Sequence, residues 1–138
     1  MERKGFPEGE LLALLAFFEK RPGTFELYQA VEAGLVSALP PFTRAIQKTQ
    51  ITFYNPGVFA CISLPRFALP AEQKGSILLS LGLPAKPPSP RIVRWAEPRP
   101  GRATCHILLS DPGELDGELL DWLSQAYDFA KWKKGRRG

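Results

Sequence analysis

An alternating stretch at residues 48 to 64, KTQITFYNPGVFACISL, constrains the fold of this chain more than any other feature. Polar and apolar residues alternate with a period of two on both sides of an Asn-Pro-Gly signal at 55–57, and this period is typical of half-buried β-strands. The Pro-Gly pair favours a turn. The sequence therefore predicts a hairpin with one buried face. Its expected opposite partners are Ile51 with Ile62 and Phe53 with Ala60.

This hairpin sorts its side chains into two predicted faces. The core face holds Thr49, Ile51, Phe53, Ala60, Ile62 and Leu64. The opposite, polar face holds Lys48, Gln50, Thr52, Tyr54, Phe59, Cys61 and Ser63. The assignment depends on loop length, because a turn longer by one residue exchanges the faces and a turn longer by two keeps them.

Two helices are predicted before the hairpin. Residues 8 to 20 are apolar nearly all round, so this helix should pack on more than one side. Apolar residues spaced three and four positions apart predict a second helix from Phe25 to about Leu39. Thr24 is its expected N-cap, and the two prolines that follow end it.

Further strands and one helix are predicted after the hairpin. The strands are residues 76–83, 91–97 and 102–110, and the last two are joined by a Pro- and Gly-containing turn. Asp111, followed by proline and by an acidic residue three positions on, indicates a helix N-terminus. An amphipathic helix should follow, with its apolar stripe laid on the sheet or on the first two helices.

The predicted order is two helices, four or five strands and one helix. Strands that are not interleaved with helices favour an α+β fold with an antiparallel meander. We expect one domain at residues 1–130, in which two N-terminal helices and one C-terminal helix pack on one face of the sheet. Residues 131–138 are expected to form a basic tail.

The composition is that of one ordinary globular domain. The chain has 138 residues, enough for a single core, and 44% of them are hydrophobic. Its net charge of +4 comes from the closing segment KWKKGRRG, which holds five of the 18 Lys and Arg residues. The rest of the chain has 13 basic residues against 14 acidic ones. The positive charge therefore belongs to the tail and not to the domain.

Two isolated cysteines, Cys61 and Cys105, lie in apolar runs without redox or metal-ligand spacing. They predict reduced, partly or fully buried thiols in a cytoplasmic protein, with one disulfide as the open alternative. The charged opening MERKGFPEGE does not resemble a secretory signal. No apolar run approaches the roughly 20 residues of a membrane-spanning helix, so we expect no membrane partner.

The segments KTQITF, FACISLP and GRATCHILLSDPGELDGELLDWLSQAYDFA resemble the domain of unknown function 5655 family, which is distantly similar to the YdhG-like domains. In that family a Lys-Thr strand leads into a hairpin, and a strand ending in Leu-Ser precedes a helix with Leu, Trp and Ala-Tyr positions. The resemblance spans residues 15–130. It implies a fold rather than a function, and the iron handling linked to some YdhG-like proteins is an analogy only.

No catalytic motif is found, since the chain lacks GxSxG, HExxH, a Walker loop and GxGxxG. His106 is the only histidine, so a general-base or metal role would fall to it alone, although a lone strand histidine is more often structural. Cys61 shares its predicted face and is a conceivable nucleophile. Neither a metal nor a cofactor is predicted.

The acidic side chains of the last helix should face solvent rather than bind iron: Glu118, Asp121 and Asp128.

The polar face of the sheet is the candidate binding surface. A concave site there would take a small polar or anionic ligand or a protein partner. Its candidate residues are Lys48, Gln50, Thr52, Arg94 and His106. The alternative is a solvated face, which antiparallel sheets often have.

The basic tail is the basis of a second hypothesis. Its cations are candidates for binding nucleic-acid phosphates, with Trp132 available for stacking, and the alternative is a flexible solvated terminus. These candidates are Lys131, Lys133, Lys134, Arg136 and Arg137. We therefore expect a non-enzymatic ligand-binding or protein-interaction module, with accessory nucleic-acid binding as the second hypothesis and an enzyme as the third.

Overall fold

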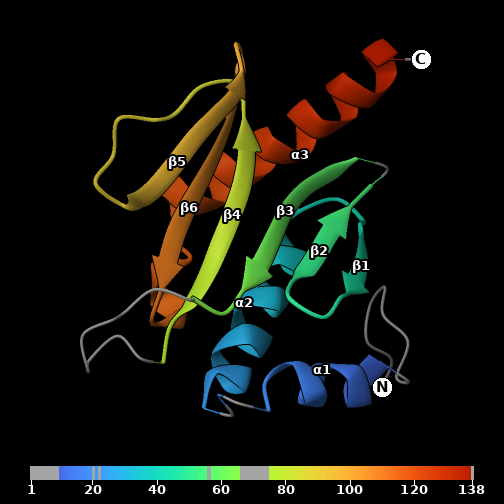
Figure 1. The fold of residues 1–138 in the computed structure, drawn as a ribbon, viewed down its shortest axis with the longest axis vertical. Coiled ribbons are helices and arrows are strands. Elements are labelled where there is room, and N and C mark those ends of the chain that lie inside the picture. The colour runs from blue at the N-terminus through green and yellow to red at the C-terminus, as the bar shows by residue number, and fades with distance from the viewer. Residues whose placement is uncertain (1–9, 20, 22, 56, 66–74, 138) are drawn as a thin grey trace.

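A six-stranded antiparallel sheet is the framework of the fold (Figure 1). The computed structural model describes residues 10–19, 21, 23–55, 57–65 and 75–137. From edge to edge the strands lie in the order β1-β2-β3-β4-β6-β5. Their bounds are Thr43–Ile46 (β1), Ile51–Tyr54 (β2), Val58–Ser63 (β3), Ile77–Leu83 (β4), Ile92–Arg99 (β5) and Arg102–Leu109 (β6). The α+β class is confirmed, but six strands replace the four or five expected.

β1 is the strand that the sequence did not predict. Its four residues are too few to show a period of two, and one of them, Arg44, is charged yet buried. The turn after β1 is closed by a 2.9 Å hydrogen bond from the Gln47 N–H to the Gln50 carbonyl. β2 therefore begins at Ile51, and Lys48 belongs to this turn rather than to a strand.

β5 lies at the far edge of the sheet, because β4 pairs with β6 and not with its neighbour in sequence. The linker at 84–91 carries the chain past β6, and β5 then pairs with β6 across the predicted turn. Gly101 in that turn has a φ of 80°, a conformation that suits glycine. The strands therefore do not form a simple meander.

The β2–β3 hairpin has the predicted register up to a β-bulge near its tip. The expected pairs Ile51 with Ile62 and Phe53 with Ala60 are both present. Beyond them Tyr54 pairs with Val58, so Phe59 is the extra residue of the bulge. Phe59 was expected on the polar face, but the bulge turns it into the core, where it is 2% exposed. Pro56 lies outside the described residues.

Three α-helices accompany the sheet: α1 (Leu11–Phe17), α2 (Thr24–Ala38) and α3 (Gly117–Arg137). α3 packs against β3 and β4, and α2 packs against β4, whereas α1 lies beside β1 at one end of the sheet (Figure 1). The predicted packing of all three helices on one face is thus only partly matched. Within the described part of the chain, no helix has both the length and the apolar character needed to cross a membrane.

α1 buries one side only. Leu14 is buried, but Leu11, Leu12 and Leu15 are exposed, Leu12 by 77%. The expectation that this helix packs on more than one side is therefore wrong. The helix has more apolar side chains than its contacts with the sheet and α2 can bury. Residues 8, 9 and 20 of the predicted span lie outside the described residues.

The helix starts differ from the prediction in detail. Thr24 is the first residue of α2 rather than its N-cap, and its hydroxyl donates to the Arg21 carbonyl at 2.6 Å. Asp111 and Glu114 form the predicted capping box, but it opens the 3-10 turn η3 (Pro112–Glu114), and α3 begins only at Gly117. α3 then continues through residues 131–137, where a separate tail was expected.

A buried ion pair joins β1 to the first two helices. Arg44 donates through Nη1 to the Glu32 carboxylate of α2, and through Nη2 to Glu10 beside α1 at 2.7 Å. The Tyr28 hydroxyl donates to Glu32 at 2.8 Å, and both residues are 0% exposed. Burial, and then the charge of Glu32, raise the pKa of Tyr28, so it stays a neutral phenol. Burial acts to lower the pKa of Arg44, but hydrogen bonds to Glu10 and Tyr28 outweigh it and the net shift is upward.

Replacing Arg44 with glutamine should remove the guanidinium that pairs with the buried Glu32 carboxylate. We expect the free energy of unfolding to fall by about 3–5 kcal/mol, measured by urea denaturation. Arg91 is the matched control, because its ion pairs with Asp116 and Glu118 lie at the surface. Arg91→Gln should cost no more than about 1 kcal/mol. Equal losses in the two variants would contradict the structural role of Arg44.

Candidate functional site

One face of the sheet carries a row of side chains directed away from the core. The register aligns one residue from each of five strands: Thr52, Cys61, Ser80, His106 and Arg94. Paired residues on antiparallel neighbours lie on the same face. The residues next to them in sequence, such as Ile62 and Ile107, are buried against the helices. We call the side that carries the row the open face.

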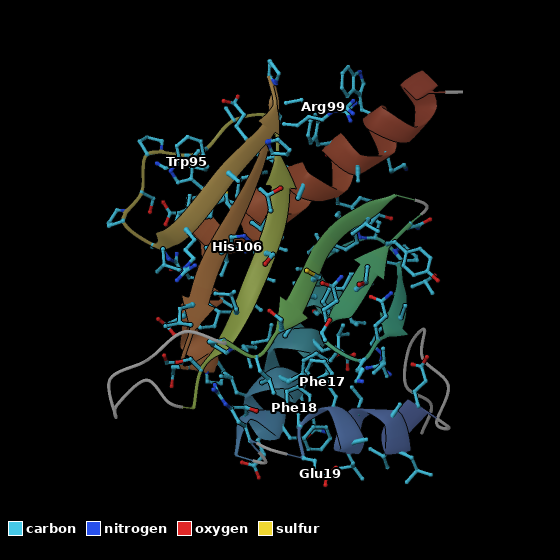
Figure 2. All side chains as sticks on the ribbon, in the orientation of Figure 1. Phe17, Phe18, Glu19, Trp95, Arg99 and His106 are labelled. Carbon is cyan, nitrogen blue, oxygen red and sulfur yellow. The ribbon has the colours of Figure 1, made fainter. Side chains whose placement is uncertain are left out.

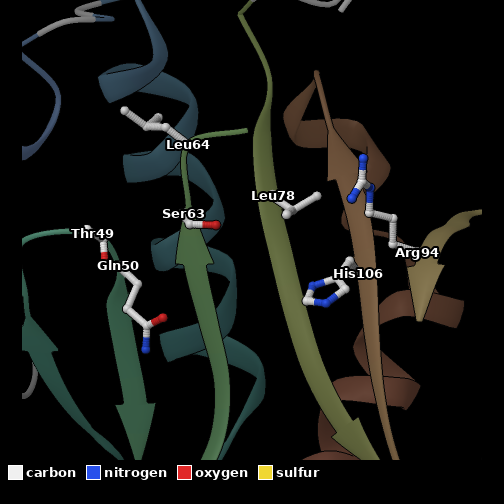
Figure 3. Close-up of a pocket in the computed structure, with 7 residues that line it drawn as sticks. All are labelled: Thr49, Gln50, Ser63, Leu64, Leu78, Arg94 and His106. Carbon is white, nitrogen blue, oxygen red and sulfur yellow. The ribbon is translucent and has the colours of Figure 1, made fainter. Parts of the chain in front are cut away.

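A depression of about 450 Å³ lies on this open face (Figure 3). Its lining comes from the β1–β2 turn, from strands β3 to β6 and from the residue just after β3: Thr49, Gln50, Ser63, Leu64, Leu78, Arg94 and His106. Two of these residues are apolar, four are neutral polar or titratable, and Arg94 is a permanent cation. Among the residues that the structure describes, no carboxylate belongs to the lining.

His106 is held in place by Ser80. Its Nδ1 lies 2.6 Å from the Ser80 Oγ on the neighbouring strand β4. Burial, and then the positive charge of Arg94, lower the pKa of His106. The ring is therefore neutral at neutral pH, and its other nitrogen, Nε2, is the one directed away from Ser80.

Thr52 positions Gln50 at the rim of the depression. The Gln50 amide donates to the Thr52 hydroxyl at 2.9 Å, and that hydroxyl donates to Gln47 at 2.7 Å. Thr52 itself is buried. It was predicted as a ligand contact, but its geometry is that of a residue that orients Gln50.

Lys48 lies outside this depression and lines a neighbouring one of about 580 Å³ beside the end of α1. The two depressions share Thr49 and Leu64. Of the five predicted residues, the structure thus brings Gln50, Arg94 and His106 together. It places Thr52 outside the lining, hydrogen-bonded to Gln50, and Lys48 in the adjacent hollow.

The two cysteines are free and lie on opposite faces of the sheet. Cys61 is on the face of His106, as predicted, but Ser80 stands between them in the row. Burial raises the pKa of the Cys61 thiol, and a hydrogen bond with Ser80 only partly opposes this shift. A nucleophilic thiolate activated by His106 therefore finds no support in the geometry.

The basic residues at 131–137 continue α3. Lys131 Nζ lies 5.9 Å from the centre of the Tyr127 ring. Trp132 is 53% exposed and stacks on Phe129, with ring centres 5.7 Å apart and an angle of 14°. The side chains that the structure describes do not include those of Lys133, Lys134, Arg136 and Arg137.

The sequence missed part of the lining. Thr49 and Leu64 were assigned to the core face, because the alternation was extended beyond the ends of the strands. Both residues lie outside strands, where alternation no longer fixes the direction of a side chain. Leu78 lies on the same face of β4 as Ser80, and the alternation of residues 76–83 is the signal that could have found it.

Fold and site together define a small α+β domain with one polar sheet face that no described helix covers. The chain belongs to the family described as a domain of unknown function (DUF5655), whose model matches residues 16–130. The family resemblance seen in the sequence is confirmed, and similarity to the YdhG-like domains stays a prediction. No curated protein and no solved structure matches the chain.

Replacing Arg94 with glutamine should raise the pKa of His106, because it removes the nearby charge that disfavours the imidazolium. The single histidine makes this measurable from its ring resonances in an NMR pH titration. Arg99, at the other end of β5 and outside the lining, is the matched control (Figure 2). Arg99→Gln should leave the pKa unchanged. The same pKa in both variants would show that Arg94 does not act on His106.

Proposed function

We propose that this protein is a non-enzymatic binding module that takes a small polar or anionic ligand, or a protein partner, on the open face. The observation that carries the proposal is the depression in which Gln50, Arg94 and His106 converge from distant parts of the chain. A cytoplasmic location belongs to the proposal and is supported by the two free cysteines.

The dimensions and chemistry of the depression support a ligand site. Its volume of about 450 Å³ falls in the range of small-molecule sites, which combine apolar surface with a few placed polar groups. Ser80 orients His106 and Thr52 orients Gln50, so two of the polar groups are held before any ligand arrives. Such preorganisation reduces the entropic cost of binding.

Filling the depression should weaken binding. Ser63→Phe places a ring in the lining while leaving the core side of β3 unchanged. A library of small polar and anionic compounds would be screened by NMR on the full chain, with backbone shifts locating each binder. We expect binders to shift the lining residues, and Ser63→Phe to weaken them by about tenfold or more.

Thr104→Phe is the matched control, because Thr104 lies on the open face of β6 but outside the lining. It should leave these affinities unchanged. Binders that shift residues elsewhere, or that tolerate Ser63→Phe, would overturn the open-face site.

A second candidate function is nucleic-acid binding through the end of α3. It is favoured by the continuation of the helix through five basic residues and by the exposed Trp132. Phosphate contacts would make the affinity fall steeply with salt. The stacking of Trp132 on Phe129 already gives one base-sized platform at this surface.

Replacing the five basic residues of 131–137 with glutamine should abolish salt-dependent binding of single-stranded oligonucleotides, measured by fluorescence polarisation. Glutamine keeps a helix propensity close to that of lysine and arginine, so the helix should persist. Arg99→Gln with Arg102→Gln is the control at the tip of the β5–β6 hairpin. Binding that survives the five-residue change would remove this second function.

A further inference from the structure

We propose that the hollow beside the end of α1, which we call the α1 hollow, is a separate binding site for the carboxylate or phosphate group of a small organic acid, held between Arg21 and Lys48. The hollow has a volume of about 580 Å³, and its lining comes from the end of α1, the β1–β2 turn and the end of β3. The inference does not depend on the proposed function, because the described lining of this hollow includes neither Arg94 nor His106.

An unpaired nitrogen of Arg21 is the first observation that favours an anion. Its Nη1 is buried, and among the described residues it is the one buried side-chain nitrogen or oxygen without a hydrogen-bond partner. Natural proteins pair nearly all of their buried polar groups, so an unpaired guanidinium nitrogen indicates an acceptor that comes from outside the chain. The oxygen of a carboxylate or a phosphate is such an acceptor.

The backbone of Arg21 is fixed, whereas its guanidinium is free to turn. The Arg21 N–H donates to the Phe18 carbonyl at 3.0 Å, and the Arg21 carbonyl accepts from the N–H and the hydroxyl of Thr24 at 3.0 and 2.6 Å. The residue as a whole is only partly buried and lines the hollow. Turning the guanidinium toward the hollow therefore breaks no hydrogen bond at Nη1. It would then offer two parallel N–H donors to one acidic group.

Lys48 supplies a second positive charge from a distant part of the chain. Lys48 and Thr49 form the tip of the β1–β2 turn, which the hydrogen bond between Gln47 and Gln50 closes, and both tip residues line the hollow. Among the described residues, no carboxylate forms an ion pair with Lys48 or with Arg21. Both charges are therefore available to a ligand, and the Thr49 hydroxyl adds a neutral donor.

Glu19 is the one carboxylate of the described lining, and it opposes the two cations. The described lining still has one more positive charge than negative charge. Figure 2 shows Phe17 on the side of α1 that faces the sheet, whereas Glu19 lies at the outer margin of the molecule. Glu19 is exposed, so solvent and salt screen its repulsion of an anion. We therefore expect Glu19 to weaken anion binding rather than to prevent it.

The apolar part of the lining favours an acid with an apolar body. Phe17 and Leu64 are half-buried, and Pro65 is buried beside them in the sequence. A body that covers Phe17 and Leu64 removes apolar surface from water, which adds to the affinity. The volume of the hollow falls in the range of small-molecule sites, so an aromatic ring that carries an acidic group fits it.

Three probes of similar shape test the charge of the ligand: phenylacetate, phenylacetamide and phenethylamine, which are anionic, neutral and cationic. Each would be titrated into the full chain at low ionic strength while NMR follows the backbone amides and the Arg21 Nε–H resonance. We expect phenylacetate to shift Arg21, Thr49 and Leu64 and to bind about tenfold or more tightly than phenylacetamide. Phenethylamine should bind no more tightly than phenylacetamide. Phenyl phosphate should also bind, and whichever acid binds more tightly identifies the acidic group.

Variants assign the effect to its residues. Arg21→Gln should weaken phenylacetate about tenfold or more, and Lys48→Gln should weaken it too. Arg99→Gln, with the same change in net charge at the far end of β5, should not. Glu19→Gln should strengthen phenylacetate, because it removes the one repelling carboxylate of the described lining. Since Nη1 of Arg21 has no partner, Arg21→Gln should not lower the temperature of thermal unfolding.

The outcomes separate this inference from the proposed function. Ser63→Phe should leave phenylacetate binding unchanged, because Ser63 lines the open-face depression and is not in the described lining of the α1 hollow. Phenylacetate that is lost in Ser63→Phe but bound normally by Arg21→Gln would overturn the α1 hollow and support the open-face site. Equal affinities for phenylacetate and phenylacetamide, or no shift at Arg21 with either acid, would overturn the inference and leave the open-face proposal standing. A lower unfolding temperature of Arg21→Gln with unchanged affinity would assign Arg21 a structural role instead.

Discussion

The buried pair of Arg44 and Glu32 is the interaction on which the arrangement of this fold depends. A charge taken out of water is tolerated only with close partners, so β1 can stay in the sheet only where α1 and α2 bring their carboxylates to it. The chain continues from β1 directly into the β1–β2 turn, which contains Thr49 and Gln50. One wall of the candidate site is therefore positioned by an ion pair on the opposite side of the sheet.

The two faces of the sheet serve different purposes. The helix side is filled by large apolar residues from α2, α3 and five strands, which supply most of the driving force for folding. The open face adds little apolar burial. It can therefore carry hydroxyls, an imidazole and a guanidinium at small cost, because water or a ligand remains available to them. The edge position of β5 adds Arg94 to this row without burying it.

Much of the fold was predictable from the sequence, and the failures have physical causes. The alternation in β2 and β3 identified the register of Ile51 with Ile62, because one buried face imposes a period of two. β1 was missed because its inward residue is Arg44, whose burial depends on carboxylates distant in sequence. The pairing of β4 with β6 is likewise a tertiary choice that no local pattern records. Three site residues were predictable as polar strand positions or their neighbours, whereas Thr49 and Leu64 lie outside strands and were not.

The bulge at Phe59 has an evolutionary consequence. It absorbs one residue between the turn at 55–57 and the part of β3 that carries Cys61 and Ser63. Changes of turn length among relatives should therefore be accommodated at the hairpin tip, since the face of β3 is set by its pairing with β4. An insertion beyond Ala60 has no such buffer and would exchange the two faces of the strand. Length variation in this family should accordingly concentrate on the turn side of the bulge.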